Sequence, residues 1–156
     1  MKNPRLSNRA VGSLHAGLLI LRLGMGLSLF FVFGIPKVHD AWAYAHTGQW
    51  RFVDFNRKVG LPLPVVAAVL QTLNESVGAL CLAAGFLGRL AALTLAAGFG
   101  VATFCSLKAG EAAWLTAAYF TLIFTTLLLT GPGNFSLDYL LRSKKLTGIE
   151  ENGLTK

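Results

Sequence analysis

A run of residues from Leu61 to Gly88 is almost entirely apolar or small. A helix rises about 1.5 Å per residue, so roughly 20 such residues are enough to cross the hydrocarbon core of a bilayer. Glu75 lies near the middle of this run. An ionisable group at that depth costs at least about 2.5–3.5 kcal/mol on insertion scales, so it normally faces other helices and marks a function or a structural ion pair. We therefore expect Glu75 to be central to this protein.

The composition of the whole chain also indicates a membrane protein. Of its 156 residues, 54% are hydrophobic and 13% are charged, and the mean hydropathy is +0.58. These values are not those of a soluble domain. The net charge of +7 would suit a nucleic-acid-binding protein, but the Lys and Arg residues lie mostly in short polar segments between apolar runs. Membrane topology explains that distribution better, and we predict no nucleic-acid partner.

The apolar runs predict an all-α fold, a polytopic membrane four-helix bundle. We expect transmembrane helices over about 14–35, 64–87, 90–107 and 112–130, within a domain of residues 14–141 that is flanked by cytoplasmic tails at 1–13 and 142–156. The first run follows basic residues, as the core of a signal peptide does. It is too long for such a core and contains Arg22, so we interpret it as a retained helix. Membrane lipids are its expected surroundings, and the sequence is compatible with an oligomer.

An aromatic-rich loop from Pro36 to Pro62 is the only long connection that the sequence predicts. Aromatic rings and basic heads suit the headgroup level of a membrane, as an interfacial flap or a short amphipathic helix. A plain aromatic belt would explain this composition. The alternative is a lid over a ligand or partner site, because long connections are often functional. In that interpretation the lid or interface candidates are Lys37, Trp42 and Trp50.

The basic residues predict the orientation of the bundle. The side with the two termini has Lys2, Arg5, Arg9, Arg89, Arg142, Lys144, Lys145 and Lys156. The opposite side has fewer: Lys37, Arg51, Arg57, Lys58 and Lys108. By the positive-inside rule, both termini are predicted to be cytoplasmic.

Arg22 and Glu75 form the sharpest candidate pair. With helices at the predicted positions, the two residues differ in depth by roughly 8 Å, which their side chains can bridge. We expect them to pair in the bundle interior, with Asn74 or Gln71 completing the hydrogen bonds. The pair is then either a structural fastener between two helices or a functional site that relays protons, and the sequence leaves both interpretations open.

Small and polar residues also recur at helical spacing on two neighbouring predicted helices. On the second helix they form one broad face, which includes Gln71, Asn74 and Gly78. On the third helix, Gly98 and Cys105 belong to such a face. Glycine on these faces allows close approach between helices.

The cysteines and histidines do not indicate a redox or metal site. Cys81 and Cys105 are expected near 15 Å apart along the membrane normal, whereas a disulfide needs Cα atoms within about 7 Å. His15, His39 and His46 are dispersed and lack ligand spacing, so no metal site is predicted. No motif for an intrinsic haem, flavin or iron–sulfur cofactor occurs, and we do not expect this chain to be catalytic alone.

Several short motifs, taken in order, resemble the DoxX family of small bacterial four-helix membrane proteins. The motifs are Leu21-Arg22-Leu-Gly24, Gly34-Ile-Pro-Lys37, Gly60-Leu-Pro, Glu75 with Gly78, Gly88-Arg89-Leu-Ala-Ala, Gly131-Pro132-Gly133 and Ser136-Leu-Asp138. The similarity covers roughly residues 14–141. It implies a multi-pass protein of the bacterial inner membrane, in a family linked to sulfur and thiol redox chemistry. Members include relatives of a thiosulfate:quinone oxidoreductase subunit.

The resemblance implies an accessory membrane subunit of a sulfur/thiol- or quinone-linked oxidoreductase complex. Its partner would be a peripheral or soluble oxidoreductase, and a quinone is the external cofactor that the resemblance suggests. One alternative is a non-catalytic membrane scaffold that stabilises a partner. A small transporter is less favoured, because neither an inverted repeat nor a pair of broken helices is evident.

Overall fold

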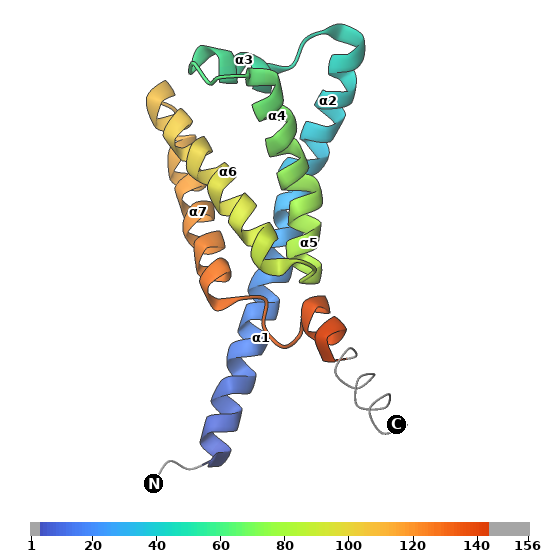
Figure 1. The fold of residues 1–156 in the computed structure, drawn as a ribbon. Coiled ribbons are helices and arrows are strands. Elements are labelled where there is room, and N and C mark those ends of the chain that lie inside the picture. Colours follow the sequence, from blue (N-terminus) through green and yellow to red (C-terminus); the bar gives the residue numbers. More distant parts are fainter. Residues whose placement is uncertain (1–3, 144–156) are drawn as a thin grey trace, which may run out of the picture.

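The computed structural model describes residues 4–143, which form helices joined by short connections. Four helical segments of this part of the chain are long and apolar enough to cross a membrane, and they run alternately up and down (Figure 1). The elements are α1 (Pro4–Leu29), η1 (Phe30–Gly34), α2 (Ile35–Thr47), α3 (Arg51–Lys58), α4 (Pro64–Leu73), η2 (Asn74–Gly78), α5 (Ala79–Ala84), α6 (Gly88–Ala109) and α7 (Ala113–Thr130). The all-α membrane bundle that the sequence predicted is confirmed.

The first span is one continuous helix made of α1, the π-helical turn η1 and α2. The sequence-based boundary at residue 35 is wrong, because it treated Pro36 as a helix stop. A proline lacks the N–H, and its ring clashes with the carbonyl four residues earlier in a regular α-helix. Just before Pro36 the helix is wider, since the N–H of Ile35 bonds to the carbonyl of Phe30. The helix therefore continues to Gly48, whose positive φ of 67° ends it.

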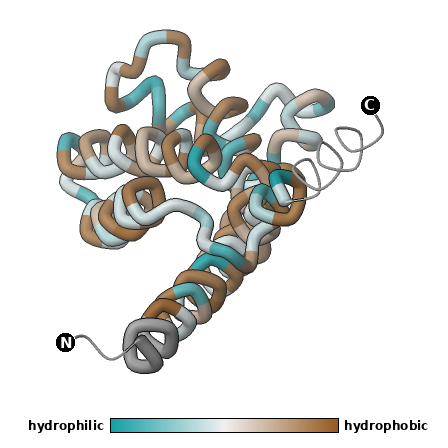
Figure 2. Tube along the Cα trace, turned by 60° about the horizontal axis from the view of Figure 1, so that its bottom comes forward, coloured by the Kyte–Doolittle hydropathy of each residue, from teal (hydrophilic) through white to brown (hydrophobic). Residues whose placement is uncertain are grey.

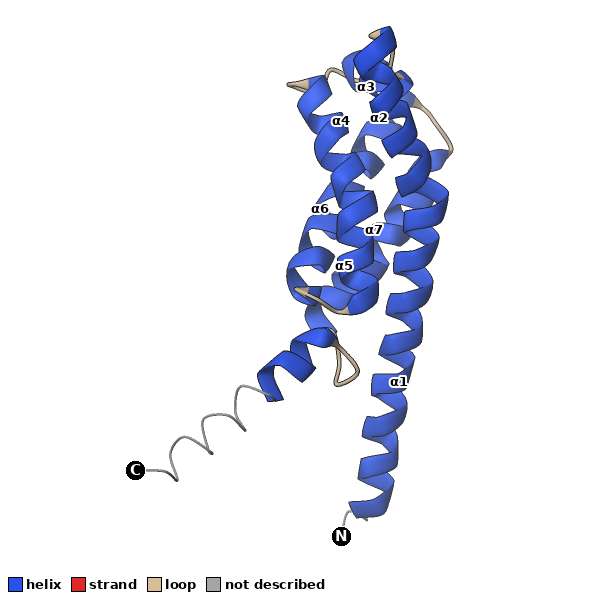
Figure 3. Cartoon of the chain, turned by 90° about the vertical axis from the view of Figure 1, so that its right-hand side faces the viewer, coloured by secondary structure: helices blue, strands red, loops and turns tan. Residues whose placement is uncertain are grey.

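Contacts with the second span define which part of the first span lies within the bundle. Gly26 lies against Ala83, and Gly34 lies against the backbone of Glu75. Each residue adds about 1.5 Å to the length of a helix. Counted from these two contacts, residues from about 22 to 44 lie at the same depth as the second span. The beginning of α1 projects beyond the bundle (Figure 3). The predicted first span, 14–35, was set too far toward the N-terminus, and the predicted tail 1–13 is helical from Pro4 onward.

The other three spans agree with the sequence-based boundaries to within a few residues. Predicted helices at 64–87, 90–107 and 112–130 correspond to Pro64–Ala84, Gly88–Ala109 and Ala113–Thr130. Leu87, with a positive φ of 48°, marks the sharp turn before α6. Of the predicted tail 142–156, residues 144–156 lie outside the described part of the chain.

Large apolar side chains cover the outside of the bundle. Ile20, Leu122 and Leu129 are among the most exposed of these side chains. Figure 2 shows mainly hydrophobic tube along the long helices, with short hydrophilic interruptions. Such a surface is costly in water, and a lipid bilayer is the environment that it fits.

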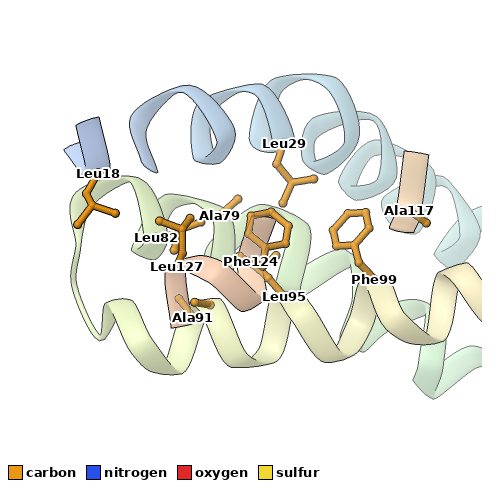
Figure 4. Packing of buried hydrophobic residues seen from close by; sticks show 11 residues of the cluster. Leu18, Leu29, Ala79, Leu82, Ala91, Leu95, Phe99, Ala117, Phe124 and Leu127 are labelled. Atoms are coloured by element: carbon orange, nitrogen blue, oxygen red, sulfur yellow. The ribbon is translucent and has the colours of Figure 1, made fainter. Parts of the chain in front are cut away.

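The core lies where all four spans meet. Leu29 of the first span packs with Leu82, Leu95 and Phe124 of the other three (Figure 4). Phe99 and Phe124, from α6 and α7, have ring centroids 5.6 Å apart. In a membrane such packing holds helices together by dispersion and shape, because lipid tails are as apolar as the core.

Short helical segments lie at the two ends of the bundle. At one end α3 crosses the span ends (Figure 1), and its buried Val53 packs with Trp50 and Ala68. At the other end, residues 137–143 form a short helical segment next to the α5–α6 connection. The predicted aromatic-rich loop is therefore largely helical, because α2 extends the first span and α3 follows it.

Candidate functional site

A buried ion pair joins the first two spans near the middle of the bundle. The Glu75 side chain is 2% exposed, and its Oε2 lies 2.5 Å from Nζ of Lys37, which is 22% exposed. This contact is an ion pair rather than an aligned hydrogen bond. Gln71, one turn earlier, donates from Nε2 to Glu75 Oε1 at 2.8 Å. The Lys37 ammonium also lies 4.4 Å from the ring centre of Phe52 on α3. Each oxygen of the buried carboxylate thus has a partner, as burial of a charge requires.

Two π-helical turns bring these side chains together. η1 lies just before Lys37, and η2 contains Glu75. A Cβ at Gly34 would lie 2.7 Å from the carbonyl oxygen of Glu75 and 3.2 Å from Cα of Ser76. Only glycine permits the two backbones to approach this closely. Single π turns inside α-helices are frequent at functional sites, and here two of them are packed against each other.

Arg22 has different partners from those that the sequence predicted. Its guanidinium donates to the backbone carbonyls of Ala83 at 3.3 Å, Phe135 at 2.7 Å and Pro132, and its side chain is buried. The expected Arg22–Glu75 pair is therefore wrong. The misplaced start of the first span explains the error, because it put Arg22 too deep. Arg22 lies instead at the end of the bundle, beside the α5–α6 connection.

The Gly131-Pro132-Gly133 motif forms the loop that Arg22 holds. Both glycines have a positive φ of 76°, which lets the chain turn sharply after α7. Pro132 lies between them and presents its carbonyl to Arg22. The exposed Arg89 lies beside Gly131, close enough that a Cβ there would be 3.3 Å from the Arg89 Nε. These motif residues come together in space, as part of a fastening rather than a cavity.

Asp138 completes this fastening. Its two carboxylate oxygens each accept a backbone N–H at 2.8 Å, from Leu87 and Gly88 at the start of α6. The backbone N–H of Asp138 in turn donates to the carbonyl of Gly85 at 3.0 Å. A carboxylate is well placed at a helix N-terminus, where backbone N–H groups lack partners within the helix. The segment after α7 is therefore tied to both the first and the third span.

The three lid candidates lie in three different environments. Lys37 belongs to the ion pair, and Trp42 projects from α2 with most of its surface exposed. Trp50 is buried, and its ring centroid lies 5.8 Å from that of Tyr44. The structure does not bring them together as one surface. Phe52, which sequence reasoning did not single out, is the residue of α3 that covers Lys37.

Gln71 and Asn74 lie on the side of the second span that faces α6. Both line a cavity of about 920 Å³, together with Gly98 and Cys105 of α6. Asn74 donates from Nδ2 to the carbonyl of Thr94 at 2.8 Å. The two small-residue faces that the sequence indicated therefore meet, but they leave a space between them. Gln71 links this cavity to the ion pair, since its side chain contributes to both.

Sequence reasoning missed Lys37 as the counter-ion of Glu75. A signal was present, because Gly34 and Lys37 are three residues apart and so share a helix face. That signal was hidden by Pro36, which suggested that Lys37 lay outside the membrane. The resulting set has one acid and one base, Glu75 and Lys37, between which a proton can pass, and one carboxamide, Gln71, which donates a hydrogen bond to the acid.

A model of the DoxX family matches residues 17–107 of the chain. This range is more than half of the 156 residues, and it contains Lys37, Gln71, Glu75 and Gly98. The motif residues from Gly131 to Asp138 lie outside it. No curated protein and no solved structure matches the chain. With four helices suited to crossing a membrane, the chain is a multi-pass membrane protein that belongs to the DoxX family.

Proposed function

We propose that this protein is an accessory membrane subunit of a sulfur/thiol- or quinone-linked oxidoreductase complex in the bacterial inner membrane. In this role it binds a peripheral or soluble oxidoreductase and connects the reaction to the quinone pool. The proposal takes the redox link from the DoxX family. The chain's own contribution is to position a partner and to move protons at membrane depth.

The observation that carries this proposal is the Lys37–Glu75 pair with its Gln71 hydrogen bond. Two charged groups at this depth are expensive, and fixed ionisable groups inside spans often belong to proton or substrate pathways. Reduction of a quinone to a quinol takes up two electrons and two protons, so a membrane site that supports it needs a route for protons. Glu75 and Lys37 are the groups that would provide it.

The test is to replace Glu75 by Gln in the full chain, with Asp54→Asn on the exposed surface of α3 as the matched control. Membranes containing each variant are assayed for reduction of a quinone analogue by thiosulfate and by a small thiol. A soluble partner is sought by pull-down in a gentle detergent. We expect Glu75→Gln to retain the partner while turnover falls at least about a hundredfold, the scale of a lost acid–base group. Unchanged turnover with the partner bound would remove Glu75 from the chemistry.

A second candidate function is a non-catalytic scaffold that stabilises a partner. The observation that favours it is the Arg22 fastening, which uses a buried charge to hold backbone carbonyls of α5 and of the segment after α7. Under this alternative the Lys37–Glu75 pair is also a fastener between helices. Glu75→Gln would then lower partner retention and turnover together, rather than turnover alone.

A further inference from the structure

The cavity of about 920 Å³ lies between the second span and α6, below α3. These elements diverge toward α3 in Figure 1. The rim of the cavity includes Leu70, Val77 and Val101, whose side chains are each more than half exposed. Because these residues lie within spans, the rim faces lipid rather than water. The volume falls in the range of about 300–1,000 Å³ that is usual for small-molecule sites.

The polar residues of the cavity wall are Asn56, Gln71, Asn74, Thr94, Ser106 and Glu111. Among them, the carboxamides of Gln71 and Asn74 have their orientation fixed by hydrogen bonds. Gln71 must present its Nε2 to the Glu75 carboxylate, which only accepts hydrogen bonds. Asn74 must present its Nδ2 to the carbonyl of Thr94. The two carboxamide oxygens are thereby directed to Gly98 and Gly78, which also line the cavity. Among the side-chain hydrogen bonds described for residues 11–143, none ends on either oxygen.

The charge of the wall restricts the ligand further. Of the residues that line the cavity, Glu111 alone is charged, and it lies in the α6–α7 turn rather than within a span. Glu75 is already paired with Lys37. A charged head group next to Gln71 would therefore lack a counter-ion at membrane depth, which is costly. An uncharged head that donates hydrogen bonds is the chemistry that the two oxygens can recognise.

We propose that this cavity binds an uncharged membrane amphiphile with a hydroxyl group that donates its hydrogen to Gln71 Oε1 or to Asn74 Oδ1. The apolar tail leaves past Leu70, Val77 and Val101 into the lipid. A quinol and a neutral lipid such as a diacylglycerol share this chemistry. The inference does not depend on the proposed function, because a diacylglycerol would satisfy it without any redox partner.

Gly98 offers a sharp test, since a Cβ at this position would overlap Gln71 Oε1 and lie 2.8 Å from Asn74 Nδ2. These atoms are the ends of flexible side chains, so Gly98→Ala displaces the carboxamides without moving backbone. Gly100→Ala on the same helix is the matched control, because its Cβ would make an ordinary 3.9 Å contact with Thr121.

The full chain in phosphatidylcholine nanodiscs is titrated with a short-chain ubiquinol, dioctanoylglycerol and the hydroxyl-methylated form of each. Binding is measured by calorimetry.

We expect at least one free hydroxyl compound to bind about tenfold or more tightly than its methylated form, and Gly98→Ala to remove that preference. Gly100→Ala should retain it. Asn74→Leu serves as a second variant should Gly98→Ala unfold, and the unfolding midpoint of every variant is measured. A preference for ubiquinol would join the cavity to the proposed function. A preference for dioctanoylglycerol alone would support the cavity while contradicting its link to quinones. Equal binding of free and methylated forms, or no binding, would overturn the inference.

Discussion

Lys37 and Glu75 lie far apart in the sequence, but each compensates the charge of the other inside the bundle. Either charge alone is costly at this depth, and removing one partner of a buried pair generally costs about 3–5 kcal/mol because the other is left uncompensated. Gln71 adds a hydrogen bond to the carboxylate but no charge. The stability of the first two spans against each other should therefore depend on the pair as a unit.

This dependence predicts that Lys37→Met destabilises the protein more than the double variant Lys37→Met/Glu75→Gln. We expect the single variant to lose about 3 kcal/mol, the lower end of the range, because Lys37 is 22% exposed. The double variant should recover at least about 1 kcal/mol of this loss. The measurement is the free energy of unfolding in a mild detergent, with the exposed Lys58→Met as control. A double variant as unstable as the sum of its single variants would show that the two residues are not coupled.

Arg22 uses its charge differently, because its guanidinium donates hydrogen bonds to three backbone carbonyls at once. A guanidinium has five N–H donors in a fixed plane, whereas the ammonium of Lys is a compact point charge. The three carbonyls around Arg22 come from the second span and from the segment after α7. The residue thereby connects parts of the chain that are far apart in sequence.

At the level of elements, the two π turns decide how closely the first two spans approach. η1 and η2 meet at Gly34, where the backbone of one helix lies against the backbone of the other. The same span also contains Gly24, where an added Cβ would have no neighbouring atom within 4 Å. A side chain larger than hydrogen would therefore clash at Gly34 but not at Gly24.

We expect Gly34→Ala to destabilise the bundle by about 1–3 kcal/mol, because the new methyl group would push against backbone atoms that cannot rotate away. Gly24→Ala should be neutral or slightly stabilising, since alanine favours a helix. Unfolding midpoints of the two variants in the same detergent provide the comparison. Equal midpoints would contradict the close contact between η1 and η2.

The sequence was sufficient to predict most elements, for a physical reason. Apolar runs long enough to cross a bilayer become helices because each backbone group must find its partner within the segment. Three of the four spans were therefore placed within a few residues of their observed ends. The first span was misplaced because Pro36 was expected to end the helix. The helix continues because η1, a wide turn, precedes the proline, and local residue preferences do not predict such a turn.

At the scale of the whole molecule, α1 begins at the same end of the bundle as the segment after α7 (Figure 1). The opposite end has α3 and the α6–α7 turn, with Arg51, Arg57, Lys58 and Lys108 as its basic residues. Because Lys37 is paired inside the bundle, it no longer counts toward that side. Without Lys37 the opposite end has fewer basic residues than the sequence count gave it, and the positive-inside rule still predicts cytoplasmic termini.

This arrangement predicts the outcome of reporter fusions to the full chain in a bacterial host. Alkaline phosphatase fused after Lys156 should be inactive, because that enzyme folds only outside the cytoplasm, where disulfides form. The same reporter inserted at Gly48, between α2 and α3, should be active. A green fluorescent protein at the C-terminus should fluoresce. The reverse pattern of phosphatase activity would place the termini outside.

Sequence patterns alone were enough to predict an all-α membrane protein with the motifs of the DoxX family, and a buried Glu75 at the centre of a span. These properties follow from the cost of exposing backbone and charge to lipid, which acts on each segment separately. The packing of the helices was needed to show that Lys37, rather than Arg22, is the partner of Glu75, and that a cavity lies beside Gln71. Both depend on the depth at which one helix packs against another, and that depth is set by contacts such as Gly34 on Glu75 rather than by any single segment.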